Sequence, residues 1–256
     1  MKIETVADKL KRAFANFTAF APDPVYQCPK CKDFGYEEKT AVNGHTYMVK
    51  CECAIRKAYQ RICKQAGFPL AEAKTLSDYK IWDDTTRLAK MKAEEYIRDF
   101  DTIRQQWRNW FLMFGQSGAG KTMIGRAIVK ALIERQGKPV RARAVKFYEM
   151  MQRLKAQSND TDYWNILAVY TDCELLFIDD LLKEKMVHGD LNEPDTKHLF
   201  AVLDRRYEAK RPTIITSECT SGRLDALDTA MYGRMTERAY AEIIFSGRES
   251  NYRKRA

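Results

Sequence analysis

The chain has 256 residues, of which 45 % are apolar and 31 % charged, enough for one α/β domain of ordinary size with a small appendage. No run of 18 or more apolar residues occurs, and the first residues lack the apolar core of a secretory signal, so we expect a cytoplasmic protein without a membrane span. The net charge of +9 favours a polyanionic partner such as nucleic acid, and the odd number of cysteines, seven, argues against a disulfide framework.

The first part of the chain is predicted to be a small separate module, residues 1–68. Apolar residues recur at helical spacing over residues 1–20, and the two prolines of 21–24 end that pattern. A cysteine-bearing stretch with short strand-like runs follows over 25–53, and residues 54–66 again have a helical pattern. The break at Gly67-Phe68-Pro69 then separates this module from a main domain, residues 69–256.

The main domain alternates predicted strands with predicted helices. Helices are expected over 84–106, 123–135, 147–156 and 195–210, and strands over 110–114, 140–146, 174–179 and 212–217. We expect the remainder to be mostly helical, with a basic tail. Strands that alternate with helices predict an α/β fold with a parallel sheet covered on both faces.

A phosphate-binding loop follows the first of these strands. The sequence matches G-x-x-x-x-G-K-[ST], in which glycines let backbone N–H groups turn toward phosphates and the helix N-terminus faces the anion. Lysine reaches the β- and γ-phosphates, and the threonine hydroxyl binds Mg²⁺. The predicted ATP-binding residues are therefore Gly115, Gln116, Ser117, Gly118, Ala119, Gly120, Lys121 and Thr122.

Two later strands end in polar residues that suit the same site. Leu175–Ile178 is followed by Asp179, predicted to hold Mg²⁺, and Asp180, predicted to orient or deprotonate the attacking water. Alone, such a segment is equally typical of a buried strand that ends in a turn. Ser217 and Glu218, after the last strand, are candidates to contact the γ-phosphate or the water, with a helix cap or turn as the alternative.

These motifs, taken together, resemble the AAA+ branch that holds the bacterial helicase loaders DnaC and DnaI and the transposition helper IstB. The matching segments are GQSGAGKT at 115–122, LLFIDDL at 175–181, RPTIITSE at 211–218, GRMTER at 233–238 and SNYR at 250–253. The resemblance covers residues 75–253 and implies a P-loop AAA+ fold. It also implies an arginine that completes the ATP site of a neighbouring subunit, hence self-association through ATP sites.

The resemblance supplies candidates for the arginine roles and two departures from the family pattern. Arg238 is the first candidate to act in a neighbour's site, Arg234 the second, and Arg253 is a candidate sensor within the same subunit. A helix-surface role is equally open for each of the first two. Asp180 stands where the family usually has Glu, and Glu218 where it usually has Asn, so we expect a slow ATPase that depends on a partner or on DNA.

Four cysteines in the first module have the spacing of a zinc site. Cys28 and Cys31 form a C-x₂-C pair, and Cys51 and Cys53 form a tighter C-x-C pair. His45 is an alternative ligand in place of one cysteine, and a set of reduced thiols without metal is the alternative to a zinc site. Helicase-loader relatives carry a zinc-bearing N-terminal module, which supports Zn²⁺ here.

The function expected from this resemblance is that of an ATP-dependent helicase loader, which binds single-stranded DNA and a replicative hexameric helicase. Basic residues that recur near aromatic ones suit single-stranded DNA, although a solvated face is the alternative. The basic residues are Arg141, Arg143, Lys146, Lys210 and Arg211, and the aromatic residues near them are Phe147, Tyr148 and Tyr207. An IstB-like transposition regulator is the alternative function, and a metabolic P-loop kinase is a third, for which we find no lid or substrate-binding signature.

Overall fold

The computed structural model describes residues 26–135, 138–156, 160–182 and 193–246. The chain divides into two compact units, Met1–Tyr59 and Gln60–Ala256, and the boundary expected after residue 68 stays a prediction. The helix predicted over 1–20 and the sensor candidate Arg253 lie outside the described residues. Among the described helices, none is long and apolar enough to cross a membrane.

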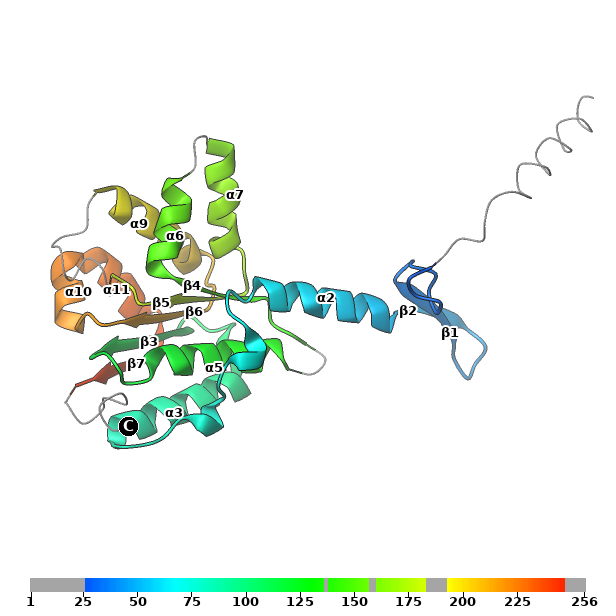
Figure 1. Cartoon of the computed structure of the whole chain (residues 1–256), viewed down its shortest axis with the longest axis horizontal. Helices are drawn as coiled ribbons and strands as arrows, with labels where there is room; N and C mark the ends of the chain where they lie inside the picture. The colour runs from blue at the N-terminus through cyan, green and yellow to red at the C-terminus, as the bar shows by residue number, and fades with distance from the viewer. Residues whose placement is uncertain (1–25, 136–137, 157–159, 183–192, 247–256) are drawn as a thin grey trace, which may run out of the picture. The chain divides into compact units, whose positions relative to one another are not determined.

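The first unit is built on a two-stranded hairpin (Figure 1). Strand β1 (Tyr36–Thr40) pairs antiparallel with β2 (Thr46–Lys50), and Gly44 in the connecting turn adopts a φ of +82°. Helix α2 (Glu52–Gln65) begins directly after the hairpin, which confirms the helical pattern predicted over 54–66. In the part of this unit that the structure describes, from residue 26 onward, the buried cluster consists of four cysteines.

The second unit contains a five-stranded sheet in the order β4-β5-β6-β3-β7, and every pairing is parallel. This confirms the predicted parallel P-loop sheet with flanking helices (Figure 1). The strands are β3 (Trp110–Gly115), β4 (Ala142–Lys146), β5 (Leu175–Asp179), β6 (Thr213–Ser217) and β7 (Ala239–Phe245). Because parallel strands share their direction, residues that follow each strand gather at one edge and residues that precede each strand gather at the other.

Helices cover both faces of this sheet (Figure 1). Side chains alternate along β3, so Phe111 and Met113 enter the core that includes α3 and α5, while Leu112 and Phe114 enter the opposite core. The helices are α3 (Asp84–Arg98), α4 (Phe100–Ile103), α5 (Lys121–Ile133), α6 (Phe147–Lys155), α7 (Asp160–Thr171), α9 (Glu193–Glu208), α10 (Ser221–Leu227) and α11 (Thr229–Glu237). Short 3₁₀ turns, η1 (Leu70–Glu72) and η2 (Leu76–Asp78), precede α3.

The structure differs from the sequence-based elements in three places. The expected helix over 84–106 is two helices, because the chain turns at Asp99. Helix α7 lies between the helix expected over 147–156 and the strand expected over 174–179, where no helix is predicted. Most importantly, β7 lies in a stretch expected to be mostly helical. It pairs with β3, and Ala241, Ile243 and Phe245 alternate as its buried side chains.

Candidate functional site: nucleotide pocket and cysteine cluster

The loop over 115–120 joins the end of β3 to the start of α5, as the motif predicts. Gly115, Gly118 and Gly120 have φ values of +108°, +82° and +85°, a region that L side chains seldom adopt. A Cβ on Gly115 would lie 2.1 Å from the carbonyl oxygen of Phe245, on β7, so only glycine fits at this position. The Nζ of Lys121, which is buried, donates to the carbonyl oxygens of Gly115 at 2.8 Å and Gln116 at 2.6 Å.

A segment between α2 and α3 braces this loop, and the sequence motifs give no sign of it. The hydroxyl of Tyr79 donates to the carbonyl oxygen of Ala119 at 3.0 Å, and a Cβ on Gly120 would lie 2.6 Å from the Tyr79 ring. Lys130, on α5, donates from Nζ to the carbonyl oxygens of Leu70 and Ala73, each at 2.9 Å. The turns η1 and η2 are thereby tied to the loop and its helix.

These elements enclose a pocket of about 390 Å³. That volume lies within the range of small-molecule sites, about 300–1,000 Å³. The phosphate-binding loop forms one part, and Arg126 and the first turns of α5 form another. The lining residues are Glu72, Ala73, Lys74, Ser117, Gly118, Ala119, Gly120, Lys121, Thr122, Met123, Arg126, Asp180 and Glu218.

Asp179, at the end of β5, lies beside Thr122 at the start of α5. Its Oδ1 accepts from Thr122 Oγ1 at 2.8 Å and from Thr216 Oγ1 at 2.7 Å. Burial raises the pKa of the Asp179 carboxyl, and the hydrogen bonds from the two hydroxyls oppose that shift. A hydroxyl beside a carboxylate offers the oxygen ligands that Mg²⁺ prefers. A bound cation would also favour the ionised form of the Asp179 carboxyl, which burial alone disfavours.

Asp180 also reaches the pocket, whereas Ser217 does not face it. Asp180 has a φ of +56° and donates its backbone N–H to Thr216 Oγ1 at 3.0 Å. Ser217 is fully buried, donates to the carbonyl oxygen of Leu181 at 2.6 Å, and accepts from the N–H of Cys219 at 3.0 Å. The hydroxyl expected to contact nucleotide is thus held in the turn after β6. Thr216, one residue earlier, is the hydroxyl that meets Asp179.

The arginines predicted to act between subunits are placed very differently from one another. Arg238 is fully buried just before β7, its Nη2 donates to Asn109 Oδ1 at 2.8 Å, and its guanidinium lies 4.5 Å from the centre of the Trp107 ring. It therefore sits at the sheet edge away from the phosphate-binding loop, and a role in a neighbour's ATP site does not fit its burial. Arg234 is partly exposed, with Nε 2.9 Å from Asp204 Oδ1.

The four cysteines of the first unit form one cluster, with all four sulfur atoms within 4.8 Å of one another. Cys28 Sγ and Cys51 Sγ are 3.7 Å apart, and Cys31 Sγ and Cys53 Sγ are 3.3 Å apart. Sulfur atoms about 2.3 Å from Zn²⁺ in a tetrahedron lie about 3.8 Å from one another. The cluster therefore suits zinc with small adjustments.

Local backbone contacts hold this cluster together. The N–H of Gly35 donates to Cys31 Sγ at 3.3 Å, and the N–H groups of Gln27 and Cys28 donate to the carboxylate of Asp33. A hydrogen bond from the backbone of Cys31 lowers the pKa of the Cys28 thiol to about 7, whereas hydrogen bonds raise the pKa of the Cys51 and Cys53 thiols, so metal binding would have to displace protons from those two. His45 is exposed in the β1–β2 turn and is not part of the described cluster.

Comparison with known proteins places this site in a family. The chain is 32 % identical over 206 residues to the uncharacterized protein YqaM of Bacillus subtilis, covering 78 % of this chain and 64 % of that protein. It is 26 % identical over 251 residues to the phage-like element PBSX protein XkdC of the same organism, covering 92 % of this chain and 89 % of that protein. The crystal structure of the DnaC helicase loader shares the fold, with a TM-score of 0.54 and 20 % identity over 67 % of this chain and 96 % of that one.

A family model described as IstB-like ATP binding protein matches residues 40–256, which include the phosphate-binding loop, Asp179 and β7. The chain belongs to the IstB-like family of ATP-binding proteins.

Proposed function

We propose that the protein is a cytoplasmic, ATP-dependent helicase loader that binds single-stranded DNA and a replicative hexameric helicase. The observation that carries the proposal is the presence, in one chain, of an ATP-binding pocket on a parallel P-loop sheet and of a separate four-cysteine unit. The likeness in fold to a DnaC helicase loader supports it. In this proposal the cysteine unit, held by Zn²⁺, contacts the helicase, and the nucleotide pocket controls how long the contact lasts.

In this proposal, different residues of the pocket bind the phosphates, bind Mg²⁺ and position the attacking water. Lys121 exchanges its contacts with the loop carbonyls for the β- and γ-phosphates, while the backbone N–H groups of the loop hold the phosphate oxygens. Thr122 and Asp179 would hold Mg²⁺, which would supply positive charge to the phosphates. Asp180 and Glu218 border the pocket where the attacking water would lie, and the short side chain of Asp180 makes hydrolysis slow.

Self-association follows from the same chemistry. A second subunit that supplies an arginine to this pocket would neutralise charge on the γ-phosphate. Arg234 is the candidate that the described residues leave for this role, because it is partly exposed and its partner, Asp204, is a half-exposed carboxylate. Breaking an exposed ion pair of this kind costs about 0–1 kcal/mol, so Arg234 can leave it for a phosphate.

A transposition regulator is the second candidate, and the family match itself favours it. Such a protein would use the same ATP site to assemble on DNA, but it would bind a transposase in place of a helicase. The partner protein therefore separates the two candidates.

The experiment is native mass spectrometry of the full chain mixed with the hexameric replicative helicase of its own organism, with and without ATP. We expect a complex that depends on ATP and is lost or changed in stoichiometry in Lys121→Ala. Arg87→Gln is the matched control, because Arg87 is exposed on α3 and pairs only locally with Asp84. A complex with a transposase and none with the helicase would favour the second candidate and overturn the first.

A further inference from the structure

Four basic side chains meet in a cavity of about 460 Å³ at the sheet edge opposite the nucleotide pocket. They come from segments that precede different strands: Arg141 precedes β4, Lys210 and Arg211 precede β6, and Arg104 follows α4. Two carboxylates, Asp172 and Glu174, also line the cavity, so its charged lining is net positive. No residue of this cavity lines the nucleotide pocket.

The two carboxylates pair with three of the four basic side chains, the arginines. Glu174 Oε1 lies 2.8 Å from Nη2 of Arg104, and Glu174 Oε2 lies 3.3 Å from Nε of Arg141. Asp172 Oδ1 lies 3.5 Å from Nη1 of Arg211. The Arg141 side chain is 63 % exposed, so its guanidinium remains open to an anion from solvent.

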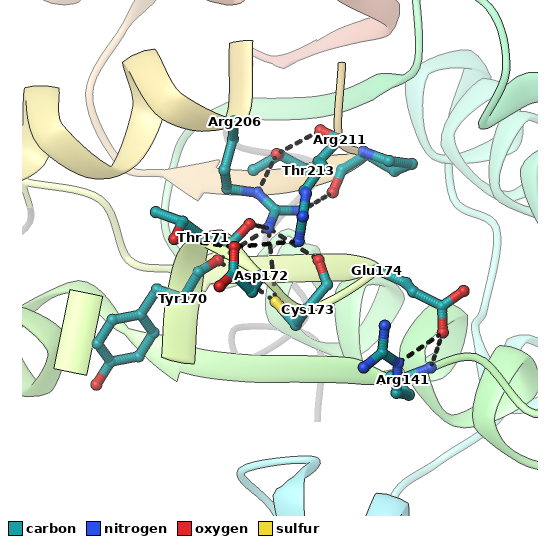
Figure 2. Close-up of polar contacts among 10 residues, drawn as sticks. Arg141, Tyr170, Thr171, Asp172, Cys173, Glu174, Arg206, Arg211 and Thr213 are labelled. Carbon is teal, nitrogen blue, oxygen red and sulfur yellow. Dashed lines mark hydrogen bonds and ion pairs between the residues drawn. The ribbon is translucent and has the colours of Figure 1, made fainter. Parts of the chain in front are cut away.

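The buried Arg206 joins the loop that carries Asp172 and Glu174 to the start of β6, which follows Lys210 and Arg211 (Figure 2). Its Nη1 donates to the carbonyl oxygens of Tyr170 at 2.8 Å and Cys173 at 3.1 Å, before β5. Its Nη2 donates to the carbonyl oxygen of Pro212, and its Nε to Thr213 Oγ1 at 2.9 Å, at the start of β6. The guanidinium thus joins the amino ends of two strands, so the cavity is built before any ligand arrives.

Lys210 occupies a backbone position that favours glycine. Its φ is +53°, and it lies in the turn after α9, where its N–H bonds the carbonyl oxygen of Tyr207 and the N–H of Arg211 bonds that of Arg206. Helices that end in this way usually carry glycine at such a position, because a Cβ is strained there. A lysine here points to a use for its charge beyond the folding of the turn.

A partly exposed aromatic ring lies next to Lys210, one of the residues that line the cavity. Trp107 is 40 % exposed, and the Nζ of Lys210 lies 5.7 Å from the centre of its ring. Asn109 ties the segment that carries Trp107 to the cavity, because its Nδ2 donates to the carbonyl oxygens of Arg104 at 3.3 Å and Lys210 at 2.9 Å. The Arg238 guanidinium already lies 4.5 Å from the centre of this ring, so the exposed part of the ring is the surface that Trp107 can offer to a base, beside basic groups that can meet the backbone.

The geometry points to this cavity, formed by Arg104, Arg141, Lys210 and Arg211 beside Trp107, as the surface on which the protein holds the phosphate backbone of single-stranded DNA. The inference rests on the proposed function and adds to it the position of the strand. Because the cavity and the nucleotide pocket lie at opposite edges of the sheet, DNA and ATP bind together without direct competition.

The test measures binding of a fluorescent oligothymidylate to the full chain by anisotropy across a range of salt concentrations. The variant is Arg141→Gln with Lys210→Gly, and the control is Lys64→Gln with Arg87→Gln, which removes the same charge from exposed helix positions elsewhere. Each lost phosphate contact lowers the salt slope by about 0.7 and the affinity at 50 mM salt by roughly tenfold. We expect a lower salt slope and a lower DNA affinity in the double variant but not in the control, and an unchanged affinity for ATP in both.

Lys210→Gly by itself separates a binding role from a structural one. Because glycine suits the positive φ, the melting temperature of the Lys210→Gly protein should equal or exceed that of the wild type, while its DNA affinity falls. Equal DNA affinity in the variant and the wild type would overturn the inference and leave the proposed function standing, and so would equal losses in variant and control. Duplex DNA bound as tightly as the single strand would overturn the assignment to a single strand. A wild type that binds no DNA would remove the inference and the DNA component of the proposed function together.

Discussion

The hydroxyl of Thr122 lies 2.8 Å from Oδ1 of Asp179, which brings the first turn of α5 to the end of β5. Asp179→Asn keeps an oxygen at this position, and that oxygen can still accept both hydroxyl hydrogen bonds, but the negative charge is lost. We therefore expect the variant to bind a fluorescent ATP analogue with nearly the same affinity in Mg²⁺ and in EDTA. The wild type should bind at least about tenfold tighter with Mg²⁺, which is about 1.4 kcal/mol. Equal Mg²⁺ dependence in both proteins would contradict the assignment of Asp179.

The same substitution should have a pH-dependent effect on stability. Burial raises the pKa of Asp179, so the folded state disfavours the ionised carboxylate and takes up a proton more readily than the unfolded state, whose carboxyl has a pKa of about 3.9. Without divalent cations, Asp179→Asn should therefore be more stable than the wild type at pH 7. The difference in the free energy of unfolding between the variant and the wild type should shrink as the pH falls through the raised pKa of Asp179 toward about 3.9. Urea unfolding of both proteins from pH 7 to pH 4 measures this difference. A difference that grows as the pH falls would contradict a raised pKa of Asp179 in the folded protein.

Gly125 tests how closely α5 packs on the sheet. A Cβ at Gly125 would lie 2.3 Å from the ring of Phe177, on β5, whereas a Cβ at Gly233, on α11, meets nothing within 4 Å. Overpacking should make Gly125→Ala less stable by about 1–2 kcal/mol in spite of the better helix propensity of alanine. Gly233→Ala should be more stable by about 0.5–1 kcal/mol. Chemical denaturation measures both, and a stabilising Gly125→Ala would contradict the packing of α5 against Phe177.

The cysteine cluster predicts one zinc ion per chain. Metal analysis of the purified protein should find it, and Cys51→Ser should lower the content well below one, because Cys51 is a buried member of the cluster. Cys63→Ser and His45→Ala should keep the metal, since both residues lie outside the cluster. Full zinc content in Cys51→Ser, or its loss in His45→Ala, would show that the ligand set is different.

Much of the fold and the nucleotide site follows from local patterns in the sequence. The phosphate-binding loop, the apolar strand before it and the helix after it are all set within a few residues of one another, and Asp179 ends a strand whose apolar residues are contiguous. The four cysteines have a metal-site spacing that can be recognised without any tertiary contact.

The remaining features depend on contacts between distant parts of the chain. β7 becomes a strand because it pairs with β3, more than a hundred residues earlier in the sequence. Thr216 and Ser217 are neighbouring hydroxyls at the end of one strand, and only the turn after β6 decides which one meets Asp179. Tyr79 contacts Ala119 across forty residues, and Arg238 is buried by Asn109 and Trp107, so no local pattern marks either residue.

The rate of ATP hydrolysis, with and without single-stranded DNA, tests the central claim most directly when the wild type is compared with Lys121→Ala. Loss of the Lys121 ammonium removes the charge that meets the phosphates. We predict slow hydrolysis by the wild type that single-stranded DNA stimulates, and no stimulated rate in the variant. A wild type whose rate does not respond to DNA, or a variant that hydrolyses ATP at the wild-type rate, would contradict an ATP-dependent function on DNA at this pocket.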